Sequence, residues 1–180
     1  MSRPPTPPGP WEADSLPALS PAHLAWLASL PATLSLADAF LCHATPQDDT
    51  TYWLHQVRPD GNFAPSPLSR IAPRAEGIEQ ALILCGHTHI AQAARLPDGR
   101  LIVNPGSVGC PGYEDDHPVR HRAEAGSPHA AYAILDRRGE DWQIDFRRIP
   151  YDTGPAVALA ARRGRPDWAA VLATGFLSQA

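Results

Sequence analysis

The sequence predicts one domain of mixed α/β or α+β class, and three observations support this. Apolar runs of strand length, of which ALILC at 81–85 is the clearest, alternate with stretches that have helical periodicity and helix caps. Two pairs of strand-like runs are separated by short turn signals, as in β-hairpins. The chain of 180 residues is long enough for one domain with a sizeable core, and neither an internal repeat nor an obvious linker divides it.

The N-terminal part of the chain predicts an irregular segment followed by a helix. Residues 1–19 contain six prolines and little periodicity, so we expect them to precede a single domain that spans residues 20–180. In SPAHLAWLASLP, Ser20 is placed to cap a helix and Pro21 suits its first position. Leucines spaced at three residues then form one apolar face.

The next part of the chain predicts a strand, a helix, a loop with one helix, and a second strand. The apolar run 39–42 predicts a buried strand that ends at His43. DDTTYWLHQV at 48–57 starts with an N-cap residue and predicts a short helix. Prolines break the segment 61–79, which predicts a loop with one helix, and ALILC is the strongest strand signal in the chain.

The second half predicts two hairpins and two helices. The segment 89–107 reads as a hairpin with Asp98-Gly99 as its turn. NPGSVGCPGYEDDHP at 104–118 consists of turn residues throughout, and no strand is predicted there. The runs HAAYAILD and DWQIDFRRI predict a second hairpin. The tail predicts two helices, each closed by a glycine.

Composition restricts the function classes. Hydrophobic residues make up 43% of the chain and the net charge is −4, so no nucleic-acid or membrane surface is indicated. No apolar stretch reaches the ~18 residues that a membrane span needs, and the N-terminus lacks the apolar core of a secretory signal. The three cysteines are widely spaced without a CxxC pair, which favours reduced thiols and a cytoplasmic location.

Three histidines follow two of the predicted strands and suggest a metal site. His87 and His89 come directly after ALILC and Gly86, and His43 follows the earlier apolar run. On an extended backbone, side chains two residues apart leave on the same side, and imidazole is the commonest metal ligand. Gly86 is expected to allow a tight turn there. The alternative is that the His-x-His pair arises by chance, because such a pair is not rare in a chain with eight histidines among 180 residues.

The order of four motifs resembles a known family. CHATP, LCGHTH, NPGSVG and YAILD follow one another as in the C-terminal half of the calcineurin-like metallophosphoesterases, and they are most similar to the small bacterial phosphodiesterase-type members. The resemblance covers residues 36–150, and the helical tail is also similar. It implies a four-layer αββα sandwich of two sheets flanked by helices, of which residues 20–180 would be the C-terminal portion.

The resemblance also implies a reaction and a set of site residues. Members of this family hydrolyse phosphomonoesters or phosphodiesters with two divalent metal ions such as Mn²⁺, Fe, Zn²⁺ or Ni²⁺. His43 and His87 are implied to bind one ion and His89 the other. The NPGS turn is implied to shape the site from behind through Asn104, Gly106 and Ser107.

The sequence departs from the family pattern ahead of His43. The Asp-x-His, Gly-Asp-x-x-Asp and Gly-Asn-His motifs, which supply the bridging carboxylate and the general acid, are absent. Three explanations remain open: a truncated product of a full enzyme, one piece of a split enzyme completed by an N-terminal polypeptide, and a non-catalytic binding or scaffold protein with a vestigial site. We expect the chain by itself to be inactive and prone to form oligomers.

The loop after the NPGS turn has two interpretations. Asp115, Asp116 and His117 lie in YEDDHP and could contact a small phosphate-ester substrate at the mouth of the site. The other interpretation is a solvated acidic loop without a role in binding, which is the commoner fate of such a charged run.

Overall fold

The structure is a computed structural model that describes residues 13, 15–139 and 141–178, so most of the proline-rich segment predicted at 1–19 lies outside the described residues. The chain divides into two compact units, residues 1–32 and 33–180. In the first unit, a short 3₁₀-helix η1 (Leu16–Ala18) precedes helix α2 (Pro21–Ser29). The hydroxyl of Ser20 accepts a hydrogen bond from the backbone of His23, which confirms the predicted cap.

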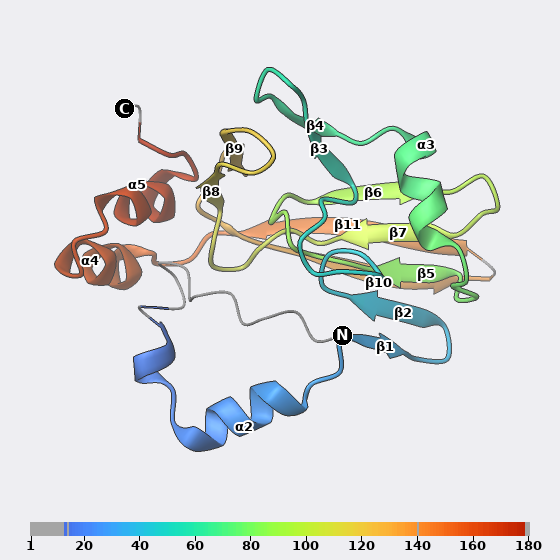
Figure 1. Ribbon diagram of the computed structural model, residues 1–180, viewed down its shortest axis with the longest axis horizontal. Coiled ribbons are helices and arrows are strands. Elements are labelled where there is room, and N and C mark those ends of the chain that lie inside the picture. The colour runs from blue at the N-terminus through green and yellow to red at the C-terminus, as the bar shows by residue number, and fades with distance from the viewer. Residues whose placement is uncertain (1–12, 14, 140, 179–180) are drawn as a thin grey trace. The chain divides into compact units, whose positions relative to one another are not determined.

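The second unit contains the strands and the remaining helices (Figure 1). Its strands are β1 (Thr33–Ser35), β2 (Ala39–Cys42), β3 (His55–Val57), β4 (Phe63–Pro65), β5 (Leu82–Leu84), β6 (Gln92–Arg95), β7 (Leu101–Asn104), β8 (Gly112–Asp115), β9 (His121–Glu124), β10 (Ala130–Arg138) and β11 (Asp141–Ile149). Its helices are α3 (Leu68–Ile71), the 3₁₀-helix η2 (Ala72–Ala75), α4 (Gly154–Arg162) and α5 (Pro166–Thr174).

A five-stranded sheet with the order β1-β2-β5-β7-β6 forms the centre of this unit. The three inner strands are parallel, with Leu41 opposite Leu84 and Leu84 opposite Val103. The edge strands β1 and β6 run antiparallel to their neighbours. Because β2, β5 and β7 are parallel neighbours, the segments that follow them leave the sheet at the same edge.

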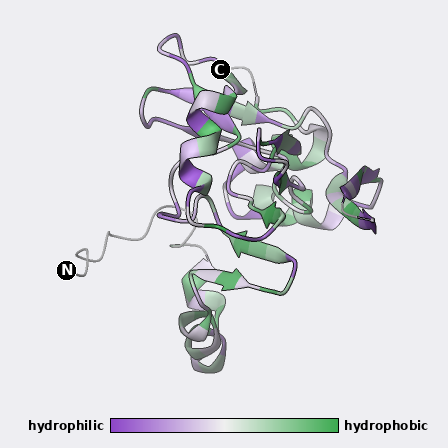
Figure 2. Ribbon diagram, turned by 90° about the vertical axis from the view of Figure 1, so that its right-hand side faces the viewer, coloured by the Kyte–Doolittle hydropathy of each residue, from purple (hydrophilic) through white to green (hydrophobic). Residues whose placement is uncertain are grey.

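The inner strands bury side chains on both faces of the sheet. Successive residues of a strand point to opposite faces, so Ile83 belongs to one core while its neighbour Leu82 belongs to the other. On β7, Ile102 shares the core of Ile83, whereas Val103 shares that of Leu82. In Figure 2 several strand arrows carry the green of hydrophobic residues, and purple marks many of the loops. This two-sided burial explains why ALILC and the LIV of residues 101–103 are continuous apolar runs.

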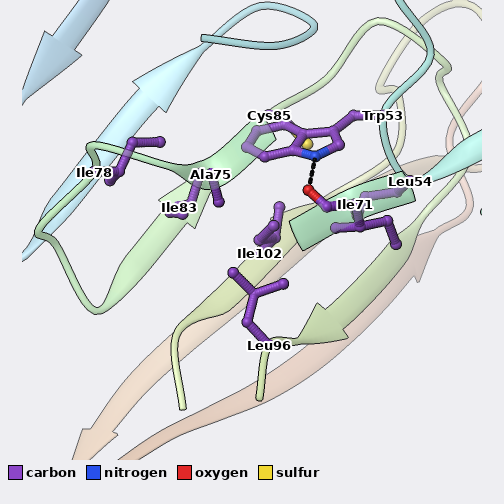
Figure 3. Close-up of a cluster of buried hydrophobic side chains, with 9 residues drawn as sticks. All are labelled: Trp53, Leu54, Ile71, Ala75, Ile78, Ile83, Cys85, Leu96 and Ile102. Carbon is purple, nitrogen blue, oxygen red and sulfur yellow. Dashed lines mark hydrogen bonds between the residues drawn. The ribbon is translucent and has the colours of Figure 1, made fainter. Parts of the chain in front are cut away.

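The first core is closed by α3, η2 and the segment before β3 (Figure 3). Trp53 is 2% exposed, and its indole nitrogen donates a 3.0 Å hydrogen bond to the carbonyl of Ile71. The aromatic ring therefore buries its apolar surface while its polar atom stays satisfied. The other members of this core are Leu54, Ala75, Ile78, Ile83, Cys85, Leu96 and Ile102.

The second core lies between the sheet and the long hairpin β10–β11. Leu82, Leu101 and Val103 are buried there. The hairpin contributes half-buried side chains at every second position, namely Ala133, Leu135, Trp142 and Ile144. Sheet and hairpin are thus two β-layers that pack face to face, and α3 with η2 covers the far side of the sheet.

The C-terminal helices α4 and α5 pack on each other, and α5 lies against the hairpin β8–β9. A Cβ at Gly112 would lie 2.9 Å from Val171 of α5, so this glycine allows close packing between strand and helix. Gly175 caps α5 in the left-handed conformation, as predicted from the glycine at the end of the tail.

Two predicted elements are wrong. Residues 48–57 are not a helix, because the carboxylate of Asp48 accepts hydrogen bonds from the backbones of Thr50 and Thr51 and fixes a turn that leads into β3. The turn-rich segment 104–118 contains β8, which pairs with β9. Its glycine and proline content concealed the first strand of a short hairpin.

The predicted α/β (α+β) class is confirmed by the mixed sheet and the helices of the second unit. The predicted hairpins β6–β7 and β10–β11 are also confirmed. None of the helices in the described residues has the length and apolar character that crossing a membrane requires.

Candidate functional site

The predicted site residues lie at one edge of the sheet. His43 directly follows β2, the loop that carries His87 and His89 follows β5, and the NPGS turn follows β7. These strands are parallel neighbours, so residues 44 positions apart in the sequence come together there. The edge beyond the carboxyl ends of parallel strands is where open α/β sheets place their ligands.

His43 and His87 form a close pair of imidazoles. Nε2 of His43 lies 3.2 Å from Nδ1 of His87, and the ring centroids are 5.1 Å apart at an angle of 66°. Two nitrogens that bind the same metal ion, each at ~2.1 Å and with an angle of about 90–110° between the two bonds, lie about 3.0–3.4 Å apart. The pair therefore fits two adjacent ligand positions of one metal ion.

A backbone carbonyl fixes the tautomer of His87. Nε2 of His87 lies 3.1 Å from the carbonyl oxygen of Thr50, which can only accept a hydrogen bond. The proton of a neutral His87 therefore sits on Nε2, and its Nδ1 accepts a hydrogen bond from Nε2 of His43 in the metal-free chain. Metal-binding histidines commonly donate their second nitrogen to a carbonyl in this manner.

The turn at residues 48–51 holds that carbonyl in place. Burial alone would raise the pKa of Asp48, but hydrogen bonds from Thr50 and Thr51 outweigh it and hold the pKa well below its usual range. Asp48 is thus a firm anion, whose oxygen accepts from the backbone of Thr50 at 2.8 Å and of Thr51 at 2.6 Å.

Both histidines of the loop favour the neutral form. Burial lowers the pKa of His87, and the neighbouring His43 lowers it further. Burial also lowers the pKa of His89, against the effect of a hydrogen bond to the carbonyl of Cys110. A neutral imidazole is the form that binds a metal ion.

One nitrogen of His89 has no protein partner. Its Nδ1 is buried, and no hydrogen bond reaches it from the described residues. An unpaired buried nitrogen costs about 1–3 kcal/mol and is usually satisfied by an unseen water or ion. The chemistry of this atom therefore fits the metal-binding role that the sequence assigned to His89.

The loop between β5 and β6 has an unusual backbone. His87 has a φ of 66° and His89 a φ of 59°, in the left-handed region that only a few per cent of non-glycine residues adopt, among which Asn, Asp and His are the most frequent. The expectation of an extended His-x-His segment is therefore wrong. Strain of about 1–3 kcal/mol per residue persists only where the surroundings impose it, and such residues cluster at functional sites.

A buried network imposes this conformation. The side-chain amide of Asn104 donates to the carbonyl of Gly86 at 2.7 Å and to the hydroxyl of Thr88 at 2.9 Å. Asn104 and Thr88 are each 1% exposed. The Thr88 hydroxyl also lies 3.3 Å from Nδ1 of the buried His55. The side chain between the two loop histidines is thus fixed from behind.

Gly86 acts through its backbone. Its amide donates to the carbonyl of His43 at 2.7 Å, which ties the end of β5 to that of β2. Its φ is not positive, and a Cβ would lie 3.6 Å from the same carbonyl, an ordinary contact. The predicted need for glycine at this turn is therefore wrong.

The NPGS turn does require its glycine. Gly106 has a φ of 93°, and a Cβ there would lie 2.8 Å from that of Ala131. The side-chain oxygen of Asn104 accepts from the amide of Gly106 at 2.9 Å. Ser107 caps the following turn, because its hydroxyl accepts from the amide of Cys110 at 2.9 Å. Asn104 thus braces the histidine loop from its buried side, while Gly106 and Ser107 shape the NPGS turn itself.

The acidic loop forms the connection of the hairpin β8–β9. The carboxylate of Asp115 lies 3.3 Å from the hydroxyl of Tyr52, whose ring packs 5.2 Å from that of His87. Asp116 and His117 are exposed in the connection. The structure therefore separates Asp115, which faces the histidine loop through Tyr52, from its two neighbours.

Sequence reasoning missed several residues around the histidines. Thr50 acts through its backbone carbonyl, which every residue type has, so the sequence does not reveal this role. Thr88 could have been found, because it stands between the two loop histidines. Tyr52 and Tyr113 come from segments assigned to a helix and to turns, so nothing in the local pattern placed them here.

The donor set is incomplete for two metal ions. Within residues 13, 15–139 and 141–178, no group of three or more His, Cys, Asp or Glu side chains is arranged to hold a metal ion. The pair His43–His87 supplies two neutral ligands and His89 one unpaired nitrogen. Neutral imidazoles do not offset the charge of two divalent ions, so the residues fit a metal in part.

An apolar cavity adjoins the pair. It has a volume of about 340 Å³ and lies against the ends of the three parallel strands and the hairpin β10–β11. Its lining residues are Leu41, Cys42, His43, Leu84, Cys85, Gly86, Val103, Pro105, Ala133 and Leu135.

Comparisons with known proteins identify the fold. No family model matches the sequence, and no curated protein matches it. A metallophosphoesterase from Sphaerobacter thermophilus has a similar solved structure, with a TM-score of 0.64 and 22% identity over 91% of this chain and 67% of that chain. A hypothetical protein from Pyrococcus horikoshii OT3 is similar with a TM-score of 0.60 and 19% identity, over 87% of this chain and 56% of that chain.

These likenesses concern the fold, because the identities are low. The chain spans just over half of the Pyrococcus protein and about two thirds of the Sphaerobacter protein. The chain has a metallophosphoesterase-like fold.

Proposed function

We propose that the chain provides part of the metal centre of a phosphoesterase, with His43 and His87 as ligands of one divalent transition-metal ion and His89 as a ligand of a second. The observation that carries the proposal is the 3.2 Å separation of Nε2 of His43 and Nδ1 of His87. The carbonyl of Thr50 keeps the proton of His87 on Nε2, so its Nδ1 is free of a proton. The metallophosphoesterase-like fold supports the same role.

The proposed substrate is a phosphomonoester or phosphodiester. Bound divalent ions such as Mn²⁺, Fe, Zn²⁺ or Ni²⁺, held by His43, His87 and His89, would supply charge stabilisation at the phosphoryl group and would lower the pKa of a bound water. The chain's own residues orient the imidazoles, keep them neutral and exclude water from behind the loop. Since the described residues offer no bridging carboxylate beside the histidines, hydrolysis needs further ligands from another segment or polypeptide, and we propose that the chain without them is inactive.

A metal titration of the 180-residue chain tests the proposal. We expect one Zn²⁺ or Mn²⁺ ion to bind weakly in isothermal titration calorimetry, and His43→Ala or His87→Ala to remove most of the heat of binding. His129→Ala is the matched control, since this histidine lies just before β10 and makes none of the contacts described above. Equal binding by all of these variants would overturn the assignment.

A second titration addresses the phosphoryl ligand. Phenyl phosphonate, a non-hydrolysable analogue of a phosphate ester, should bind the metal-loaded chain and not the metal-free chain. A chromogenic phosphodiester should be hydrolysed no faster by the wild type than by His87→Ala. Binding of the phosphonate without metal would contradict a phosphoesterase centre.

The absence of a three-ligand group in the described residues favours a second candidate, a non-catalytic protein that uses the scaffold to bind a partner. This candidate requires no metal. A chain that binds neither metal nor phosphonate, yet unfolds cooperatively as a monomer, would support it.

A further inference from the structure

We propose that Tyr52 and Tyr113, here called the tyrosine pair, orient the two histidines of the loop for metal binding. The inference deepens the proposed function and rests on it. Each tyrosine packs on one imidazole. The ring centroid of Tyr52 lies 5.2 Å from that of His87, and the ring centroid of Tyr113 lies 5.5 Å from that of His89.

The pair joins two distant parts of the chain. Tyr52 follows the turn that contains Thr50, whose carbonyl accepts a hydrogen bond from Nε2 of His87. The ring of Tyr52 packs against the same imidazole, so residues 50–52 contact His87 both at its nitrogen and at its ring. Tyr113 lies on β8 and meets His89 in an edge-on arrangement at 78°. With these contacts in place, His87 keeps one orientation, in which Nδ1 faces His43.

The hydroxyl of Tyr52 has one proton to donate and two acceptors within reach on the hairpin β8–β9. It lies 2.9 Å from Nε2 of His121 and 3.3 Å from a carboxylate oxygen of Asp115. Nδ1 of His121 lies 2.8 Å from the carbonyl of Val119, to which it must donate. In a neutral His121, Nε2 therefore accepts the proton of the Tyr52 hydroxyl. The hairpin β8–β9 thus fixes Tyr52 at its polar end.

An aromatic stack supports this arrangement from the side. The ring of Phe63 is nearly parallel to His55 on one side, with centroids 4.9 Å apart, and to His121 on the other, at 5.9 Å. The edge of Tyr52 meets the same Phe63 ring at 5.4 Å. Rotation of Tyr52 would therefore disrupt several packed rings at once.

The hydroxyl of Tyr113 has a different environment from that of Tyr52. Its oxygen is buried, and no hydrogen bond reaches it from the described residues. Tyr113 therefore acts on His89 through the packing of its ring.

Fixed orientation has a measurable effect on metal binding. Side chains that set the orientation of a ligand typically change metal affinity by about 10–100-fold when they are removed. Tyr52 and Tyr113 are positioning residues in this sense, because they act through His87 and His89 and not on the metal. Loss of either ring should reduce the affinity for the metal ion while the chain still folds.

The test uses the full chain with Tyr52→Leu, which removes the ring, and Tyr52→Phe, which removes only the hydroxyl. Tyr151→Leu is the matched control, because Tyr151 is 43% exposed and belongs to no contact of the site. Two readouts are combined: the dissociation constant for Zn²⁺, and the tautomer of His87 in the metal-free chain, read from the ¹⁵N chemical shifts of its imidazole.

In the wild type we expect the Nε2–H tautomer of His87 to predominate. Tyr52→Leu should give a mixture of tautomers and raise the dissociation constant for Zn²⁺ about tenfold. Tyr52→Phe, which keeps the ring, should show a smaller change in the same direction. The control should match the wild type in both readouts.

Two failures are distinguishable. If the wild type binds no Zn²⁺, the proposed function fails, and the tautomer readout still decides whether Tyr52 positions His87. If the wild type binds Zn²⁺ but Tyr52→Leu and Tyr52→Phe leave both readouts unchanged within twofold, the positioning role is overturned. Should Tyr52→Leu fail to fold, Tyr52→Phe decides alone.

Discussion

One face of the five-stranded sheet is closed by packed side chains, whereas the other is covered only in part. On the closed face, Ile83 and Ile102 are fully buried beneath Trp53, α3 and η2. On the open face, the hairpin β10–β11 covers the sheet but leaves the 340 Å³ apolar cavity near its edge. The closed face therefore contributes most to stability, while the open face borders the histidines and can change at lower cost.

The largest expected effect comes from adjacent residues on opposite faces of β5. Ile83→Ala should lower the free energy of unfolding by about 2–5 kcal/mol, because it leaves a cavity in a closed core. Leu84→Ala should cost about 1–2 kcal/mol, because its side chain lines a cavity that is already present. Urea unfolding measures both values. Equal losses would show that the two faces are packed alike.

The dependence of stability on pH measures the cost of protonating the buried His55. Burial lowers the pKa of His55 from 6.5 to about 4. The unfolded state therefore binds a proton between these values while the folded state does not, so stability present above pH 6.5 should fall as pH drops towards 4, by up to about 3 kcal/mol. The free energy of unfolding at several pH values measures the slope.

His55→Gln serves as the comparison for that slope. The variant should keep part of the pH dependence, because the pKa values of His87 and His89 are lowered in the same direction. An unchanged slope in His55→Gln would mean that His55 is not the group responsible.

The smallest expected effects come from enlarging an alanine on each face. Ala75 is fully buried in the closed core, so Ala75→Leu should destabilise the fold by about 1–3 kcal/mol through overpacking. Ala133 lines the cavity, so Ala133→Leu should stabilise it by about 0.5–1 kcal/mol. Thermal unfolding under identical conditions separates the two signs. Destabilisation by both would mean that the cavity has no room for a side chain.

The sequence predicted the parts of this fold that depend on local patterns. Continuous apolar runs identified β5 and β7, and Asp98-Gly99 identified the turn between β6 and β7, because burial and turn chemistry leave direct marks on residue type. The segments 48–57 and 104–118 were assigned wrongly, since an Asp side chain and a glycine-rich hairpin override the local preferences there.

The candidate site was predictable in part for the same reason. The three histidines and the NPGS turn were visible as a pattern, and the structure brings His43 against His87 as expected. The left-handed backbone of the loop was not predictable, because the network around Asn104 and Thr88 imposes it from another strand. Tyr52 and Tyr113 reach the loop only through tertiary packing.

The parallel order of β2, β5 and β7 also has a kinetic consequence. His43 and His87 are separated by 44 residues, so their meeting requires closure of a long loop before any contact rewards it. Contacts of such high sequence separation slow folding. We therefore expect the two imidazoles to come together only after β2 and β5 have paired. A ligand that needs both imidazoles would then bind the assembled sheet, so it would slow unfolding and leave the folding rate unchanged.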